Sequence, residues 1–117
     1  MNKVRSVVFD SFKKYLVLDP THSGYLRLRL SSVEPANNIE KSLTSEAREF
    51  HKNATIIEDA SDGVKAFIGI IISLIADESK LILIDEPEAF LHPTLSYKLG
   101  KEITSFVNDK QRLFIST

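Results

Sequence analysis

The sequence predicts an α/β fold, with a mainly parallel core sheet flanked by helices and an antiparallel hairpin near the N-terminus. Three patterns carry this prediction. Residues 81–84 form an apolar run with the length of a buried strand, and residues 93–107 carry apolar side chains at helical spacing. Residues 15–30 contain two strand-like segments separated by turn-forming residues.

The N-terminal region, residues 1–35, is predicted to be rich in strands. Its hairpin joins residues 15–18 to residues 25–30 through a connection that contains proline, serine and glycine. No secretory signal is visible, because no long apolar stretch follows the first residues.

Basic residues outnumber acidic ones in this region, and strand alternation places Arg27 and Arg29 on one face of the hairpin. Lys13 and Lys14 lie nearby in the sequence. Two interpretations stay open: a solvated face of an antiparallel sheet, or a surface that contacts nucleic-acid phosphates.

The middle region, residues 36–58, is predicted to be variable and helical. A helix spans residues 42–52, with Ser42 or Thr44 available as its cap and with Leu43, Ala47 and Phe50 on one face. Residues 54–57 are a short extended segment.

The third region, residues 59–117, opens on Ser61-Asp62-Gly63-Val64-Lys65 and an apolar helix over residues 66–76. This helix is apolar nearly all round, so we expect it to be buried, and it is too short to span a bilayer. A serine hydroxyl and a glycine N–H at a helix start suit an anion. The alternative is that Ser61 or Asp62 only caps the helix.

A turn at residues 77–80 leads into the apolar strand, which delivers Asp85 and Glu86 at its carboxyl end. Ligand sites in parallel sheets lie beyond such ends. Asp85 suits Mg²⁺, held directly or through water, and Glu86 suits the polarisation of an attacking water. Pro87 turns the chain away, and Glu88 ranks behind the other two acids. The alternative is an ordinary acidic junction between a strand and a loop.

The chain continues with a helix that starts near Pro93 and with a last apolar strand over residues 112–117. The helix has one apolar stripe, formed by Leu95, Leu99, Ile103, Phe106 and Val107. His92 is interpreted as a loop or capping residue rather than a metal ligand, because no second His or Cys lies at ligand spacing.

Together these motifs resemble the ATP-binding cassette (ABC) ATPase heads, a branch of the P-loop NTPases, over roughly residues 60–117. The resemblance makes residues 81–86 a Walker B motif, with Asp85 on the magnesium side and Glu86 as the catalytic base. It makes residues 61–65 the signature motif, whose Ser61, Gly63 and Lys65 would reach nucleotide bound to a partner head. Leu91, His92 and Pro93 occupy the place of the D-loop, which crosses the dimer interface.

Asp-Glu-Pro-Glu followed by Leu-His-Pro looks like the soluble branch that contains RecF, the overcoming-lysogenization-defect (OLD) ATPases and related ATPases of the AAA_21 type. Transporter subunits usually carry Leu-Ser-Gly-Gly-Gln and a Thr after Asp-Glu-Pro. This chain has neither. Asp62 and Lys65 depart from the usual signature residues.

No Gly-x-x-x-x-Gly-Lys-[Ser/Thr] motif occurs in the 117 residues, so the loop that cradles the nucleotide's phosphates is missing. We therefore expect a single partial ATPase domain, a fragment that a Walker A lobe or the remainder of the same protein completes. Its size and its 43% hydrophobic composition suit one modest core. The absence of cysteine fits a reducing cytoplasm.

The resemblance implies ATP and Mg²⁺ as cofactors, a homodimer of heads, and a role in DNA maintenance or phage defence. No membrane partner is expected, and DNA is a possible partner. The alternative is a non-catalytic interaction or dimerisation module that retains the ABC fold without Walker A.

Overall fold

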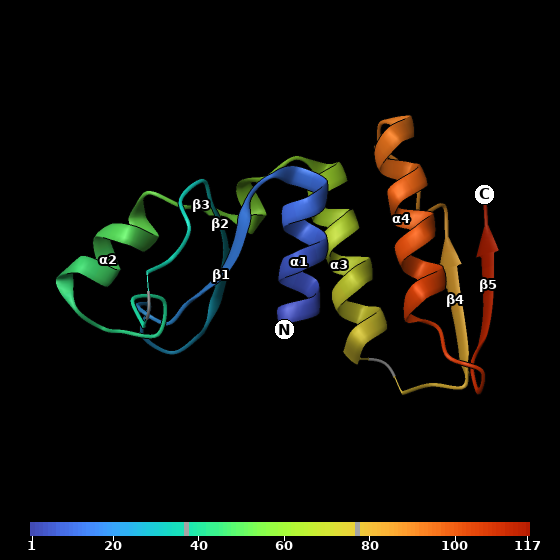
Figure 1. Cartoon of the computed structure of the whole chain (residues 1–117), viewed down its shortest axis with the longest axis horizontal. Helices are drawn as coiled ribbons and strands as arrows, with labels where there is room; N and C mark the ends of the chain where they lie inside the picture. Colours follow the sequence, from blue (N-terminus) through green and yellow to red (C-terminus); the bar gives the residue numbers. More distant parts are fainter. Residues whose placement is uncertain (37, 77) are drawn as a thin grey trace. The chain divides into compact units, whose positions relative to one another are not determined.

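The computed structural model describes residues 1–36, 38–76 and 78–117 (Figure 1). The chain divides into two compact units, residues 1–60 and residues 61–117, and each is described by itself. The four helices and five strands of the described residues form a mixed α/β structure, as predicted. One three-stranded antiparallel sheet lies in the first unit and one two-stranded parallel sheet in the second.

The first unit opens on helix α1 (Asn2–Phe12), which lies within the region 1–35 that was predicted to be rich in strands. Val4, Val7 and Val8 are buried at helical spacing, so one stripe of the helix is apolar. The helix ends at Lys13, whose left-handed φ of 55° lets its N–H donate to the Phe9 carbonyl at 2.8 Å. Because the helix ends just before the hairpin, α1 packs against the first strand.

The predicted hairpin is confirmed as β1 (Tyr15–Asp19) and β2 (Arg27–Ser31), which pair antiparallel. The second strand starts two residues later than predicted, because Tyr25 and Leu26 lie in the connection and are 54% and 66% exposed. A short strand, β3 (Thr55–Ile56), adds to the other edge of β2, and a 3₁₀ turn, η1 (Ile57–Asp59), follows it.

Helix α2 (Ser45–Lys52) confirms the predicted helix but begins three residues later. Thr44 is its cap, since its hydroxyl accepts a hydrogen bond from the Ala47 N–H at 3.2 Å. Leu43 therefore precedes the helix and is 65% exposed, which corrects its place on the apolar face. Ala47 is fully buried.

The second unit consists of α3 (Asp62–Ala76), β4 (Leu81–Asp85), α4 (Pro93–Phe106) and β5 (Arg112–Ser116). The strands are parallel, with Ile82 opposite Leu113 and Asp85 opposite Ser116, and α4 is the crossover between them (Figure 1). Leu99 and Ile103 of α4 are each 1% exposed, so the predicted apolar stripe is centred on them. Val107 lies just past the helix end.

Helix α3 is not buried all round as predicted. Phe67, Ile68, Ile71 and Leu74 are buried, whereas Ile75 is 39% exposed. The parallel sheet is also covered on one face only: Ile82 is 7% exposed and the next residue, Leu83, is 71% exposed. Of the predicted turn at residues 77–80, Asp77 lies outside the described residues.

Among the helices described, none is long and apolar enough to cross a membrane.

Candidate functional site

The carboxyl end of β4 presents the two predicted acidic residues. Asp85 is the last residue of the strand and Glu86 follows it, and both are exposed. The Glu86 N–H donates to the Ser116 carbonyl of β5 at 2.7 Å, which continues the sheet ladder by one residue. Glu86 has a φ of 43°, a left-handed conformation that is strained for a side chain other than glycine. The sheet therefore fixes the backbone of Glu86 where the chain leaves the strand.

The loop after Glu86 consists of two linked backbone turns. The Ala89 N–H donates to the Glu86 carbonyl and the Leu91 N–H donates to the Glu88 carbonyl, each at 3.0 Å. Phe90 has a φ of 65° and a side chain that is 81% exposed. The loop is thus ordered by its own hydrogen bonds, and it displays one aromatic ring to solvent.

The predicted D-loop residues lead into α4. His92 is the helix cap, because its Nδ1 accepts a hydrogen bond from the Thr94 N–H at 3.3 Å, and Pro93 occupies the first helical position. Within the described parts of the chain, no group of three or more His, Asp or Glu side chains is arranged to hold a metal ion. The observed contact of His92 is accordingly a capping contact.

The predicted signature segment forms the start of α3. The Ser61 hydroxyl accepts a hydrogen bond from the Val64 N–H at 3.4 Å, so Ser61 caps the helix. Lys65 and Asp62 form an exposed ion pair at 3.3 Å. Capping and anion binding are compatible, because one hydroxyl satisfies only one of the free N–H groups at a helix start.

Gly63 brings this segment against the loop after β4. A Cβ atom placed on Gly63 would lie 2.7 Å from the Phe90 carbonyl oxygen and 3.2 Å from Cδ2 of Leu91. Real Cβ atoms essentially never approach to 2.7 Å, so the contact requires glycine. Phe90 was not among the residues predicted for the site. The glycine within the first turn of α3 was the only sequence feature that indicated a close backbone contact at this position.

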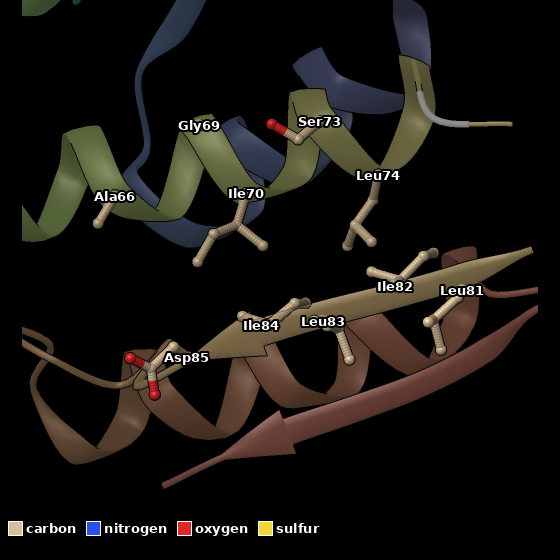
Figure 2. A pocket seen from close by; sticks show the side chains of 10 residues that line it. All are labelled: Ala66, Gly69, Ile70, Ser73, Leu74, Leu81, Ile82, Leu83, Ile84 and Asp85. Carbon is tan, nitrogen blue, oxygen red and sulfur yellow. The ribbon is translucent and has the colours of Figure 1, made fainter. Parts of the chain in front are cut away.

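A cavity of about 480 Å³ lies between α3 and β4, and Asp85 is at one end of it (Figure 2). Figure 2 shows Ile82 on the side of the strand toward Leu74, whereas Leu83 points to the opposite side. Among the described residues β4 pairs only with β5, so its second edge has no neighbouring strand. The volume lies in the range of small-molecule sites, and most of the lining residues are apolar, with Ser73 and Asp85 as the polar side chains.

A second cavity, of about 330 Å³, lies between the loop, α4 and the end of β5. Glu88 lines it together with Leu99, Ile103 and Ile115. Oε2 of Glu88 is buried and has no hydrogen-bond partner among the described residues. Glu88 therefore faces an apolar cavity that Asp85 does not line.

The hairpin arginines of the first unit are engaged with protein groups. Arg29 forms an ion pair with Asp19 at 2.6 Å and donates to the Ala54 carbonyl at 3.1 Å. Arg27 donates to the hydroxyl of Tyr25 at 2.6 Å and lies over its ring. Arg29, at 12% side-chain exposure, is an internal residue of the unit, which corrects the interpretation of both arginines as one exposed face.

Asp19 is fully buried, and its environment favours the ionised carboxylate. Burial raises the pKa of Asp19, but hydrogen bonds from the side chain and backbone of Thr21 and from Arg29 outweigh it, and His51 adds a smaller favourable charge effect. The net result is a pKa of about 2. The ion pair of Asp19 with Arg29 therefore stabilises the antiparallel sheet.

A family model described as "AAA domain, putative AbiEii toxin, Type IV TA system" matches residues 5–117. The match covers both units and includes Ser61, Gly63, Asp85 and Glu86. No curated protein and no solved structure matches the chain significantly.

Proposed function

Since this chain belongs to that family of AAA domains, we propose that it is the part of an ABC-type ATPase head that supports Mg²⁺ and the attacking water during ATP hydrolysis. The family makes the chain a nucleotide-binding, ATPase-like module of the P-loop NTPase superfamily. The finer assignment, to the branch with RecF and the OLD ATPases, rests on the motif sequence Asp-Glu-Pro-Glu and Leu-His-Pro.

The single observation that carries the proposal is the pair Asp85 and Glu86 at the carboxyl end of a parallel strand. Neither side chain forms an ion pair within residues 1–36, 38–76 and 78–117. Mg²⁺ is usually held by one or two carboxylates, with water and substrate phosphates completing the shell. Asp85 fits that open donor set, and the bound ion would supply charge neutralisation at the phosphates.

Glu86 is the proposed general base. Its backbone is fixed by the hydrogen bond to Ser116, while its side chain extends from the strand end into solvent. A carboxylate held there can accept a hydrogen bond from a water molecule. It can thereby direct the lone pair of the water oxygen at a phosphate that lies beyond the strand.

The proposal places a second nucleotide contact at the start of α3. Ser61, Gly63 and Lys65 would face the γ-phosphate of ATP bound to a second head, and Leu91, His92 and Pro93 would lie in the interface between heads. The free N–H groups of a 15-residue helix support anion binding there. A homodimer of heads with a Walker A lobe supplied by another segment or chain completes the site.

The biological setting proposed is a cytoplasmic one in DNA maintenance or phage defence. The family description names a toxin of a toxin–antitoxin system, which favours defence among these settings.

The test combines the chain with a lobe that contains Walker A and measures ATP turnover with Mg²⁺. Glu86→Gln keeps the shape and removes the base, so turnover should fall by about 100-fold or more while ATP binding persists. Glu102→Gln, on α4, is the matched control and should leave turnover unchanged. Equal turnover in the Glu86→Gln and control proteins would refute the assignment of the base.

A non-catalytic interaction module is the second candidate, and the uncovered sheet face favours it. Leu83 and Phe114 pair across β4 and β5 and are 71% and 59% exposed. Parallel sheets are normally covered on both faces, so this face suits a protein partner. Assembly with the Walker A lobe without any turnover would identify this function.

A further inference from the structure

The contact between Gly63 and Phe90 connects two segments that are far apart in the sequence. Of the glycines within helices, Gly69 and Gly100 have open space where a Cβ atom would lie, whereas Gly63 has the Phe90 carbonyl at 2.7 Å. The requirement for glycine is therefore specific to this position of α3. It arises from a backbone atom, which cannot rotate aside as a side chain can.

The loop transmits this contact to Glu86. Phe90 lies four residues after Glu86. The two overlapping turns of this loop are closed by the hydrogen bonds from the Ala89 N–H to the Glu86 carbonyl and from the Leu91 N–H to the Glu88 carbonyl. Both ends of the loop, Glu86 and Phe90, are in left-handed conformations. Because side chains other than glycine rarely adopt this region, few other backbone conformations of the loop keep both residues there. The sheet holds the Glu86 N–H, but the Glu86 carbonyl accepts from Ala89 within the loop, so a displacement of the Phe90 carbonyl would reach Glu86 through that hydrogen bond.

We propose that Gly63 is a positioning residue for Glu86: its bare Cα seats the Phe90 carbonyl, so that the start of α3 and the loop after β4 move together. The catalytic meaning of this coupling rests on the proposed function, in which Ser61 and Gly63 meet the phosphate of a second head. Engagement of that phosphate would then adjust the loop that carries the base. The mechanical coupling itself requires no nucleotide.

The experiment measures the loop in the 117-residue chain by NMR, comparing wild type with Gly63→Ala. Amide proton exchange of Ala89 and Leu91 should rise by about tenfold or more in Gly63→Ala, because their hydrogen bonds lose the conformation they need. The Glu86 amide resonance should shift as well. Gly69→Ala is the matched control on the same helix; it should not raise the exchange of either loop amide and should not shift the Glu86 resonance.

The pattern of exchange separates positioning from simple loss of stability. A larger rise in the loop than at Phe67, Ile71 and Ile82 supports the proposal, whereas an equal rise at all of these amides would show only global destabilisation and overturn it. Unchanged loop amides would overturn it too. If Gly63→Ala does not fold, the wild-type spectrum tests the contact instead. Nuclear Overhauser contacts between the Gly63 α-protons and a Leu91 methyl are then expected, and their absence would refute the packing of Gly63 against the loop.

A parallel turnover assay with the Walker A lobe keeps the two proposals distinguishable. A loop response without any ATP hydrolysis in wild type supports the coupling and rejects the proposed function. Turnover that depends on Glu86 but no loop response rejects the coupling and leaves the proposed function standing.

Discussion

Arg29 of β2 and Asp19 of β1 form an ion pair at 2.6 Å that is nearly closed to solvent, with side-chain exposures of 12% and 0%. In the sheet register Asp19 lies opposite Arg27 and Val17 lies opposite Arg29, so the pair is diagonal across the two strands. The carboxylate is also held by Thr21 through its N–H and its hydroxyl. The pair fixes the end of the hairpin and withdraws Arg29 from any phosphate surface.

This pair predicts a loss of stability in acid. The pKa of Asp19 is about 2 in the folded chain and 3.8 as the ordinary value, so the unfolded state binds the proton first as the pH falls. The stabilisation, about 2 kcal/mol, is present above pH 4 and disappears as the pH falls through about 2. Denaturant unfolding at a series of pH values measures it.

Asp19→Asn is the control for that experiment. It should flatten the pH dependence between pH 4 and pH 2 and also lower stability at pH 7, since the Arg29 charge is left without its partner. Asp62→Asn breaks the exposed pair with Lys65 and should change the free energy of unfolding by less than about 1 kcal/mol. The same pH dependence in wild type and Asp19→Asn would contradict the assignment.

The glycines of α3 predict opposite effects from one substitution. Gly69→Ala should stabilise the chain by about 0.5 to 1 kcal/mol, because alanine reduces the freedom of the unfolded chain and its Cβ meets nothing within 4 Å. Gly63→Ala should destabilise it, since the Cβ and the Phe90 carbonyl overlap. Thermal unfolding of both variants tests this, and a stabilised Gly63→Ala would be the contrary result.

The cap of α2 gives a third prediction. Thr44→Ala removes the acceptor for the Ala47 N–H and should cost about 1 kcal/mol of stability in the first unit. Thr104→Ala, near the end of α4, removes a hydroxyl that caps no helix start and should have little effect. Amide exchange of residues in α2 compared with α4 localises the loss, and equal losses in the two variants would argue against capping.

The sequence was informative where a local pattern determines the structure. Alternation predicted the hairpin, the apolar run predicted β4, and its parallel pairing with β5 is confirmed. Helix α1 was not predicted, because its buried stripe is built from Val4, Val7 and Val8, and valine is a weak helix former. The helix also lies next to predicted strands in the sequence.

Relationships between distant residues were not predictable in the same way. The contact of Gly63 with Phe90 spans two elements, and the link of Arg29 to Asp19 depends on a diagonal across the sheet. Periodicity reports which face a residue occupies, not which partner it meets. The roles of Asp85 and Glu86 stay predictions for the same reason, since their partners are a nucleotide and water.

The uncovered sheet face yields the last prediction. Leu83→Lys should change the free energy of unfolding of the chain by no more than about 0.5 kcal/mol, because this side chain is already 71% exposed. Ile82→Lys, one residue earlier and 7% exposed, should cost about 3 kcal/mol or more, since it buries a charge.

Denaturant unfolding compares the stability of the two variants, and sedimentation with the Walker A lobe then measures their assembly. If the exposed face is an interface, Leu83→Lys weakens assembly while the chain stays folded; unimpaired assembly would show that the partner contacts another surface.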